Sequence, residues 1–270
     1  MRTSNSAQFD QRRACLARSL RGLAGLGGLG VGALGLAGCA TRAPVLPATH
    51  DLSAGIAPFS AATAGALPAG WQPYVMRPDR ATTQYTVVND GPRSVLHAKA
   101  VASASGLRCA VDVDPARQGV LRFSWRVQDV PSQATVIEHE SDDSAARVVL
   151  AFAGDEARLS IRERLLFEQV ELFTGLRLPF ATLMYVWDGK QPPGTVTHNH
   201  RTSRIRYLTV ESGVARSGRW LHYERDVVAD YRRAFGEAPG HIHSVGVLTD
   251  SDAMKLDLEA WYGDITLLPA

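Results

Sequence analysis

Short runs in which hydrophobic and polar residues alternate recur along the chain from residue 84 to its end. The clearest run is Val120–Val127, where Leu121, Phe123 and Trp125 stand at every second position. Because successive side chains of a strand point to opposite faces, this run predicts a strand with one buried and one solvated face. A second run, Ala145–Phe152, is apolar at nearly every position and predicts a central strand that is buried on both faces.

The other predicted strands are equally short and end at turn residues. They are Gln84–Val88, Ser94–Val101, Gly106–Val113, Thr182–Trp187, Ile205–Glu211, Trp220–Arg225, His241–Leu248 and Leu258–Leu267. The first two are joined by Asn89-Asp90-Gly91-Pro92, a sequence typical of a hairpin turn. Evenly spaced short strands predict an all-β fold, a two-sheet β-sandwich of jelly-roll type.

Two segments depart from the strand pattern and predict inserted helices. Asp155–Phe173 carries leucines, a valine and a phenylalanine among charged residues, which is typical of an amphipathic helix. Val227–Phe235 is followed by Gly236, the residue type that commonly follows a helix end. The longer helix either packs on the core or offers its apolar side to a protein partner. With no internal repeat, residues 59–270 are predicted to form one domain.

The first 38 residues predict an export signal. Several arginines precede an apolar stretch from Leu23 to Leu36. This stretch is shorter than the ~20 residues that a membrane-spanning helix needs, so a signal peptide over residues 1–38 is the better interpretation. Arg12-Arg13 leaves open whether export follows the twin-arginine or the general route.

Leu36-Ala37-Gly38-Cys39 resembles a lipobox, so Cys39 is predicted to carry lipid. Residues 39–58 would then join the lipidated cysteine to the domain through an Ala/Pro-rich tether. Ala40 follows the cysteine in place of Asp. By resemblance to the sorting rule of enterobacterial lipoproteins, Ala40 favours the periplasmic side of the outer membrane over the inner membrane. The membrane, through this lipid anchor, is the first partner we expect.

The charge distribution does not indicate a nucleic-acid partner. The chain has 29 basic and 27 acidic side chains, of which residues 1–38 hold five and one. The remainder therefore has an excess of two acidic side chains, whereas a nucleic-acid-binding domain needs a clustered basic face.

With Cys15 in the signal and Cys39 lipidated, Cys109 is the remaining thiol. Strand alternation places the Cys109 side chain on the same side as Leu107 and Val111. It is therefore predicted to be buried as a small apolar side chain.

The sequence lacks the common catalytic motifs, which favours a protein that is not an enzyme. We therefore assign no catalytic residue and expect no cofactor. It has no Gly-x-Ser-x-Gly, His-Glu-x-x-His or Cys-x-x-Cys motif. His198 and His200 form one His-x-His pair, and His241 and His243 form another. Each pair could chelate zinc, but the spacing fixes no third ligand, and exposed or hydrogen-bonded histidines are the alternative.

Carboxylates gather in two places. Asp142 and Asp143 precede the apolar strand that contains Arg147, and they either bind a ligand or form a salt-bridged corner. Asp250 and Asp252 follow a predicted strand, where they either cap a turn or supply oxygen ligands to a structural calcium ion.

Aromatic and basic residues suggest where a glycan would bind. Trp187 and Trp220 stand near the ends of predicted strands and are candidates for stacking on sugar rings. Arg122 and Arg126 lie on the polar side of their strand, and together with Arg147 they are expected to line one polar sheet face.

Several motifs, taken in order, resemble the bacterial domain of unknown function 3047 family. They are Asp142-Asp143-Ser144-Ala145-Ala146-Arg147-Val148, Tyr185-Val186-Trp187, Arg225-Asp226-Val227-Val228-Ala229-Asp230-Tyr231, Thr249-Asp250-Ser251-Asp252 and Ala260-Trp261-Tyr262-Gly263-Asp264-Ile265. The resemblance covers residues 59–268 and implies no established activity. The order of elements at the end of the chain is also similar to jelly-roll carbohydrate-binding modules.

These observations leave three hypotheses for function. The first is a lipid-anchored, non-enzymatic domain that binds an envelope polysaccharide. The second is a glycan-active hydrolase or lyase that uses Asp142 or Asp143. The third is an assembly or scaffold lipoprotein that meets an envelope protein through the helix predicted within residues 155–173.

Overall fold

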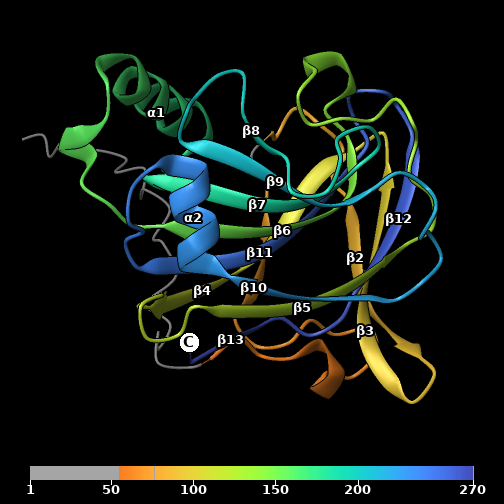
Figure 1. Ribbon diagram of the computed structural model, residues 1–270. Coiled ribbons are helices and arrows are strands. Elements are labelled where there is room, and N and C mark those ends of the chain that lie inside the picture. The colour runs from red at the N-terminus through yellow and green to blue at the C-terminus, as the bar shows by residue number, and fades with distance from the viewer. Residues whose placement is uncertain (1–54, 76, 270) are drawn as a thin grey trace, which may run out of the picture. The chain divides into compact units, whose positions relative to one another are not determined.

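The computed structural model describes residues 55–75 and 77–269 of the chain. The predicted signal peptide, Cys39 and most of the tether therefore lie outside the described residues. The described part belongs to one compact unit, Pro47–Ala270. It folds into two β-sheets packed face to face, with two α-helices outside them (Figure 1). The predicted β-sandwich with inserted helices is confirmed.

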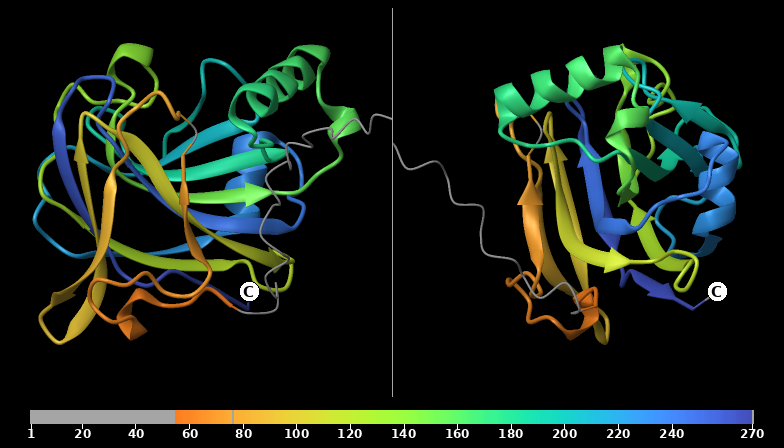
Figure 2. Two further views of the ribbon diagram at one scale, coloured as in Figure 1. Left: turned by 180° about the vertical axis from the view of Figure 1, so that it is seen from behind. Right: turned by 90° about the vertical axis from the view of Figure 1, so that its left-hand side faces the viewer.

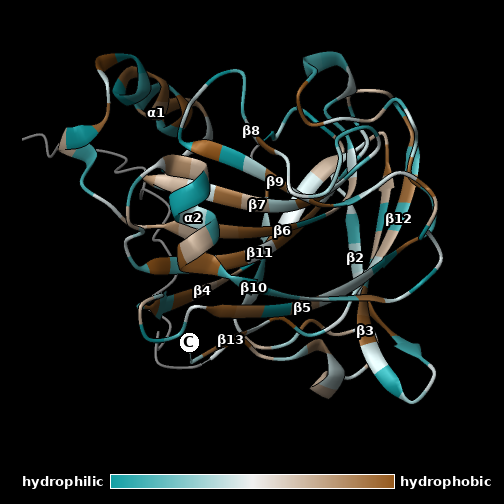
Figure 3. Cartoon of the chain, viewed as in Figure 1, coloured by the Kyte–Doolittle hydropathy of each residue, from teal (hydrophilic) through white to brown (hydrophobic). Residues whose placement is uncertain are grey.

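The larger sheet has seven strands in the spatial order β1-β4-β11-β6-β7-β9-β8. Their bounds are Trp71–Tyr74 for β1, Ala104–Val113 for β4, Ile242–Asp250 for β11, Ser144–Phe152 for β6, Ala181–Asp188 for β7, Ile205–Ser212 for β9 and Val196–His198 for β8. β7 and β9 pair in parallel, and the other neighbours are antiparallel. Figure 3 shows hydrophobic residues running along β4, β6 and β11, as expected for the central strands of a covered sheet.

The smaller sheet has six strands in the order β10-β5-β12-β3-β2, with β13 paired to β5. Their bounds are Leu221–Asp226 for β10, Val120–Val127 for β5, Asp257–Tyr262 for β12, Arg93–Val101 for β3, Gln84–Asp90 for β2 and Thr266–Leu268 for β13. The single strand predicted over 258–267 is interrupted, because residues 263–265 leave the ladder between β12 and β13. The two halves, β12 and β13, pair with different parts of β5.

Aromatic side chains from both sheets form the core between them. The rings of Trp125 on β5 and Trp187 on β7 lie 6.2 Å apart, and those of Phe123 and Tyr185 lie 5.8 Å apart. Tyr262 of β12 reaches the other sheet, where its hydroxyl donates to the Leu248 carbonyl at 2.9 Å. Large buried rings contribute most of the apolar area that stabilises such a sandwich. Cys109 belongs to this core, as its alternating context predicted.

The helices are α1 (Ile161–Thr174) and α2 (Val227–Phe235), with short 3₁₀ turns at Phe59–Ala61, His139–Ser141 and Glu156–Arg158. Both α-helices end at a glycine with positive φ, 69° at Gly175 and 74° at Gly236, a conformation that costs other residues energy. Ser160 and Glu163 form a capping box that starts α1. The helix predicted from Asp155 therefore begins later, after a separate 3₁₀ turn.

Each helix covers a different part of the sandwich (Figure 2). α2 packs beside β9 and β10, and its Tyr231 side chain is fully buried in the core. α1 runs across one end of the molecule and buries Phe167. Neither helix in the described residues has the length and apolar composition required to cross a bilayer.

Candidate functional site

The outer face of the six-stranded sheet carries a row of aromatic and basic side chains. Arg126 on β5 lies opposite Trp261 on β12, and Trp261 lies opposite His97 on β3. Residues directly opposite in a sheet point to the same side, so the three side chains touch. The His97 and Trp261 rings stack with centroids 4.8 Å apart, and the Arg126 guanidinium lies 4.3 Å from the Trp261 ring centroid.

Trp220 extends this row over the outer face of the sheet towards β2 and β3. It precedes β10, and its ring centroid lies 5.4 Å from the Arg126 guanidinium and 4.5 Å from that of Arg93. We call these five side chains the Arg–Trp row: Arg93, Trp220, Arg126, Trp261 and His97. All five are partly exposed. A cation over an indole face is favourable by about 0.5–1 kcal/mol at such sites, so each contact helps to order the next.

A polar hollow of about 370 Å³ adjoins the row. Its walls include Arg93, Arg122, His222, Glu224 and Asp264, and Ser124 lies among them. Ser124 lies next to Gly263, which has no side chain to fill the space. The Arg122 guanidinium donates to Glu224 at 2.6 Å. The hollow thus offers several charged donors and acceptors to one polar ligand.

Arg147 does not line this face, which corrects the prediction that Arg122, Arg126 and Arg147 share one surface. Arg147 lies on β6 of the seven-stranded sheet and points to that sheet's outer side, where its guanidinium lies 5.6 Å from the Tyr207 ring centroid. The arginines therefore face opposite sides of the sandwich. Strand alternation gave the inside–outside pattern of each strand, but sheet membership depends on pairing between distant strands.

Arg147 forms the centre of a buried charge cluster. One of its terminal nitrogens, Nη2, donates to Asp142 Oδ1 at 3.0 Å and to Asp250 Oδ1 at 2.9 Å. Asp250 also accepts from the backbone N–H of Ser144 at 2.9 Å. Burial raises the pKa of Asp250 to about 8 and also raises the pKa of Asp142, against the opposing effect of Arg147. Two buried carboxyl groups share a single cation, so the pair keeps a proton to a higher pH than an exposed carboxyl group does.

Asp143 has a structural role. Its carboxylate accepts from the backbone N–H groups of Ala253 at 3.0 Å and Met254 at 2.8 Å, which ties β6 to the turn after β11. Asp142 and Asp143 are adjacent in sequence but have separate partners. The two carboxylates therefore do not act as a pair. The second hypothesis needs only one of them, and His200 lies close enough to Asp142 for each to shift the pKa of the other.

The predicted calcium ligands are each engaged by an arginine. Asp250 contacts Arg147, and Asp252 lies 3.5 Å from Arg80 Nε. Asp250 belongs to the end of β11 rather than to the following turn. In the described ranges, no three His, Cys, Asp or Glu side chains converge as a metal site would require. The geometry therefore gives calcium binding at these two residues no support.

Trp187 is buried, with 1% of its surface exposed, so it offers no ring to a surface ligand. Its indole N–H donates to the Gly213 carbonyl at 2.9 Å, which satisfies its polar group inside the core. The prediction from its position near a strand end was wrong because the Trp187 ring points into the core between the two sheets, where it lies 6.2 Å from the Trp125 ring.

The histidine pairs also separate. His200 stacks on His139 with ring centroids 4.6 Å apart. His241 Nδ1 lies 2.7 Å from Asp112, and this contact raises the pKa of His241. His243 instead lines a groove on the outer face of the seven-stranded sheet. Within the described residues, neither pair joins a third His, Cys, Asp or Glu side chain in a cluster that could hold a metal.

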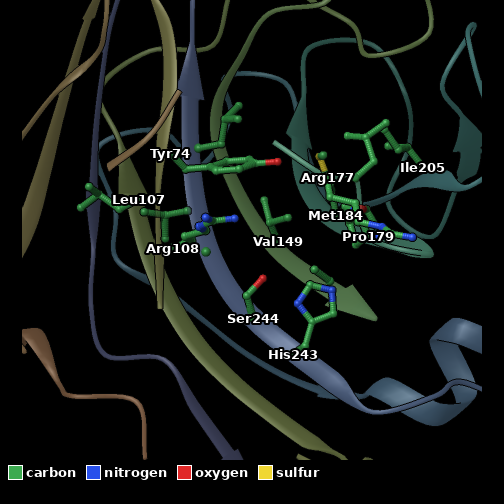
Figure 4. A pocket seen from close by; sticks show the side chains of 16 residues that line it. Tyr74, Leu107, Arg108, Val149, Arg177, Pro179, Met184, Ile205, His243 and Ser244 are labelled. Carbon is green, nitrogen blue, oxygen red and sulfur yellow. The ribbon is translucent and has the colours of Figure 1, made fainter. Parts of the chain in front are cut away.

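That groove crosses β4, β11, β6 and β7 (Figure 4). Its walls are mainly apolar and include Val149, Met184 and Leu178. Tyr74 and Arg108 stand together along one side. No sequence pattern indicated this groove, because its residues come from six strands and a loop.

α1 exposes apolar side chains. Ile161 is 70% exposed, Leu165 60%, Leu172 80% and Phe173 73%. Ile161, Leu165 and Leu172 fall on one stripe at helical spacing. The helix thus packs on the core through one side and presents a second apolar side to solvent.

Comparison with known proteins gives one family match. The family model described as "Protein of unknown function (DUF3047)" matches residues 69–266, which is more than half of the chain. No curated protein matches the sequence.

Solved structures with a similar arrangement are distant. Endoglucanase 3 of Trichoderma harzianum, from family GH12, has 10% identity and a TM-score of 0.39, with 77% of this chain and 94% of that chain covered. A family 29 carbohydrate-binding module has 11% identity and a TM-score of 0.31, with 75% and 84% covered. Tailspike protein 4 of bacteriophage CBA120 has 7% identity and a TM-score of 0.34. The alignment covers 75% of this chain but only 20% of the tailspike chain. TM-scores this low assign no function.

Proposed function

The chain belongs to the DUF3047 family, whose description assigns no function, and we propose that it binds a polysaccharide on the outer face of its six-stranded sheet. The observation that carries this proposal is the polar hollow beside the Arg–Trp row. Binding without chemical conversion is the simplest role for these side chains, because Arg122 pairs with Glu224 and Asp264 accepts from the Ser60 N–H in the resting structure.

The chemistry of the hollow suits sugar hydroxyl groups. A hydroxyl both donates and accepts, and the hollow presents guanidinium donors at Arg93 and Arg122 and carboxylate acceptors at Glu224 and Asp264. Hydrogen bonds to charged groups are stronger than neutral ones, at about 1.5–3 kcal/mol each. Basic and acidic side chains both line the hollow, which favours a glycan with little net charge.

The Arg–Trp row supplies an apolar and ordered border for the same ligand. Trp220 and Trp261 are partly exposed, and the Arg126 guanidinium lies near the centroids of both rings. A ligand that lies across the hollow would contact these side chains without a rearrangement of the row. A preorganised surface loses less side-chain entropy on binding.

We further propose that the domain is exported and lipid-anchored through Cys39, on the periplasmic side of the outer membrane. The lipobox-like Leu36-Ala37-Gly38-Cys39 supports this location. In cells fed labelled palmitate, the wild-type protein should carry label and sediment with outer membranes. Cys39→Ser should lose the label and appear in the soluble fraction. Label on Cys39→Ser would contradict the anchor.

Binding is tested with the purified chain against peptidoglycan, lipopolysaccharide and neutral glucans, by co-sedimentation and calorimetry. Arg122→Ala and Trp220→Ala should each weaken binding at least tenfold. Arg232→Ala is the matched control, because Arg232 is exposed on α2, outside the hollow. Loss of binding in all three variants, or no binding to any glycan, would overturn the proposal.

A second candidate is the scaffold function, which the exposed stripe of α1 favours. An envelope protein with a complementary apolar groove would bury Ile161, Leu165 and Leu172. A photo-crosslinker at position 165 should then yield one discrete adduct in cells, and the same crosslinker at exposed Arg232 should yield none. Equal adducts at both positions would contradict this function.

A further inference from the structure

We propose that the groove on the outer face of the seven-stranded sheet binds the alkyl chain of a fatty-acid carboxylate, with Arg108 as the group that receives the carboxylate. This site lies on the opposite side of the sandwich from the polar hollow. Its ligand is therefore distinct from the polysaccharide proposed above, and either proposal can fail without the other.

Strand register builds the floor of the groove. Arg108 on β4 lies opposite Gly246 on β11, Gly246 lies opposite Val149 on β6, and Val149 lies opposite Met184 on β7. These four positions form one row across the sheet and point to the same side. Because Gly246 has no side chain, a gap lies on the sheet surface between the side chains of Arg108 and Val149.

The walls of the groove are apolar and narrow. Val149, Ala151, Leu178, Met184, Ile205 and Leu248 line it, and the segment after α1 that contains Leu178 and Pro179 closes one side (Figure 4). The volume of the groove is about 70 Å³, which holds the first few methylene groups of a chain. A sugar ring would leave its hydroxyl groups without partners against such walls. A linear alkyl chain has no polar group to satisfy and fits a narrow groove.

Arg108 supplies the charge that selects the head group. Its guanidinium lies 4.8 Å from the Tyr74 ring centroid, and the two side chains stand along one wall (Figure 4). In the described part of the chain, no carboxylate pairs with Arg108, whereas Arg177 on the other wall pairs with Glu156. The Ser244 hydroxyl and the His243 ring lie at the same end of the groove. An anionic head group would complete the partners of Arg108.

The direct test uses the four methionines of the chain as probes. The whole chain is labelled with ¹³C at the methionine methyl groups and titrated with decanoate below its micelle concentration. The Met184 signal should shift in a saturable way. Met254, near the Asp143 turn, should stay unchanged as an internal control. Each methylene removed from the probe should weaken binding about fourfold while the chain still fills the groove.

Two variants separate the head group from the chain. Arg108→Gln should weaken decanoate at least tenfold and leave the neutral analogue decanol unaffected. Val149→Phe should fill the groove and abolish the response to both, with a thermal melt to show that the variant is folded. If Val149→Phe does not fold, the titration of the wild type with decanol tests whether the groove binds an alkyl chain, and a saturable Met184 shift is expected.

The outcomes are distinct. A Met184 shift that depends on Arg108 supports the proposal. No shift at Met184, or equal shifts at Met184 and Met254, would overturn it. Equal affinity for decanoate in the wild type and Arg108→Gln would overturn the assignment of the head group. A Met184 signal that responds only after residues 1–54 are deleted would mean that the chain's own N-terminal segment occupies the groove, which also contradicts a free ligand.

Discussion

Asp90 accepts a hydrogen bond from the indole nitrogen of Trp220 at 2.7 Å, although 130 positions separate the two residues. The second oxygen of the same carboxylate lies 3.4 Å from Arg126 Nη2. Asp90 ends β2 at one edge of the six-stranded sheet, while Trp220 precedes β10 at the other edge. One carboxylate therefore holds a tryptophan and an arginine of the Arg–Trp row in place.

Removal of this carboxylate should loosen the row. Asp90→Ala is expected to lower the free energy of unfolding by about 1 kcal/mol, since a hydrogen bond to a charged group is lost at a partly exposed site. Urea unfolding measures this change, and the accessibility of Trp220 to a fluorescence quencher should rise. Asp90→Asn keeps one acceptor oxygen and should lie between the wild type and Asp90→Ala. Identical quenching in all three proteins would contradict the role of Asp90.

The buried charge cluster makes Arg147 the most sensitive charged residue of the described chain. Arg147→Met leaves Asp142 and Asp250 buried without their cation and should cost about 3–5 kcal/mol of stability. The triple variant Arg147→Met, Asp142→Asn, Asp250→Asn replaces all three ionisable side chains and should recover much of that loss. Urea unfolding of the two variants provides the comparison. A triple variant no more stable than Arg147→Met would show that charge is not the cause.

The same cluster predicts how stability depends on pH. The pKa of Asp250 is raised from 3.8 to about 8 in the folded state. Between these values the folded chain holds a proton that the unfolded chain has released. The contribution of Asp250 to the free energy of unfolding is therefore fully present below the pKa of Asp250 in the unfolded chain. It is lost as the pH rises towards 8. The slope is at most about 1.4 kcal/mol per pH unit.

Asp250→Asn should remove this dependence, because the amide does not titrate. Urea unfolding at pH 5, 6.5 and 8 is expected to show a smaller fall in stability for Asp250→Asn than for the wild type. Parallel pH profiles would mean that Asp250 is ionised throughout this range.

Trp187 and Trp220 should behave in opposite ways. Trp187→Ala opens a cavity in the core and should cost about 3–5 kcal/mol of stability. Trp220→Ala should cost much less stability but weaken glycan binding. Thermal melts and glycan co-sedimentation of the same two preparations separate the effects. A full loss of glycan binding in folded Trp187→Ala would contradict the assignment of Trp187 to the core.

The sequence predicted most elements because alternation is a local property. β5 has the predicted bounds, Val120–Val127, and α2 has the predicted bounds, Val227–Phe235. β1 and β8 were not predicted as strands, because runs of four and three residues are too short to show a period. The interruption between β12 and β13 was also missed, because both strands run along β5 and the Gly263 N–H between them still donates to the Ser124 carbonyl.

The candidate sites depended on contacts that local sequence does not encode. Arg122, Arg126 and Trp220 meet on one face because β5 pairs with both β10 and β12. Arg147 and Asp250 meet because β6 and β11 are neighbours, although 103 positions separate them.

By itself, the sequence determined that the chain would form a β-sandwich with two inserted helices and that Cys109 would be buried, because period-2 alternation reports which side of a strand avoids water. Only the tertiary structure decided which outward side chains share a face. Strand order and register are set by packing between segments far apart in the chain. They placed the Arg–Trp row on one side and Arg147 on the other, and they buried Trp187 while leaving Trp220 at the surface.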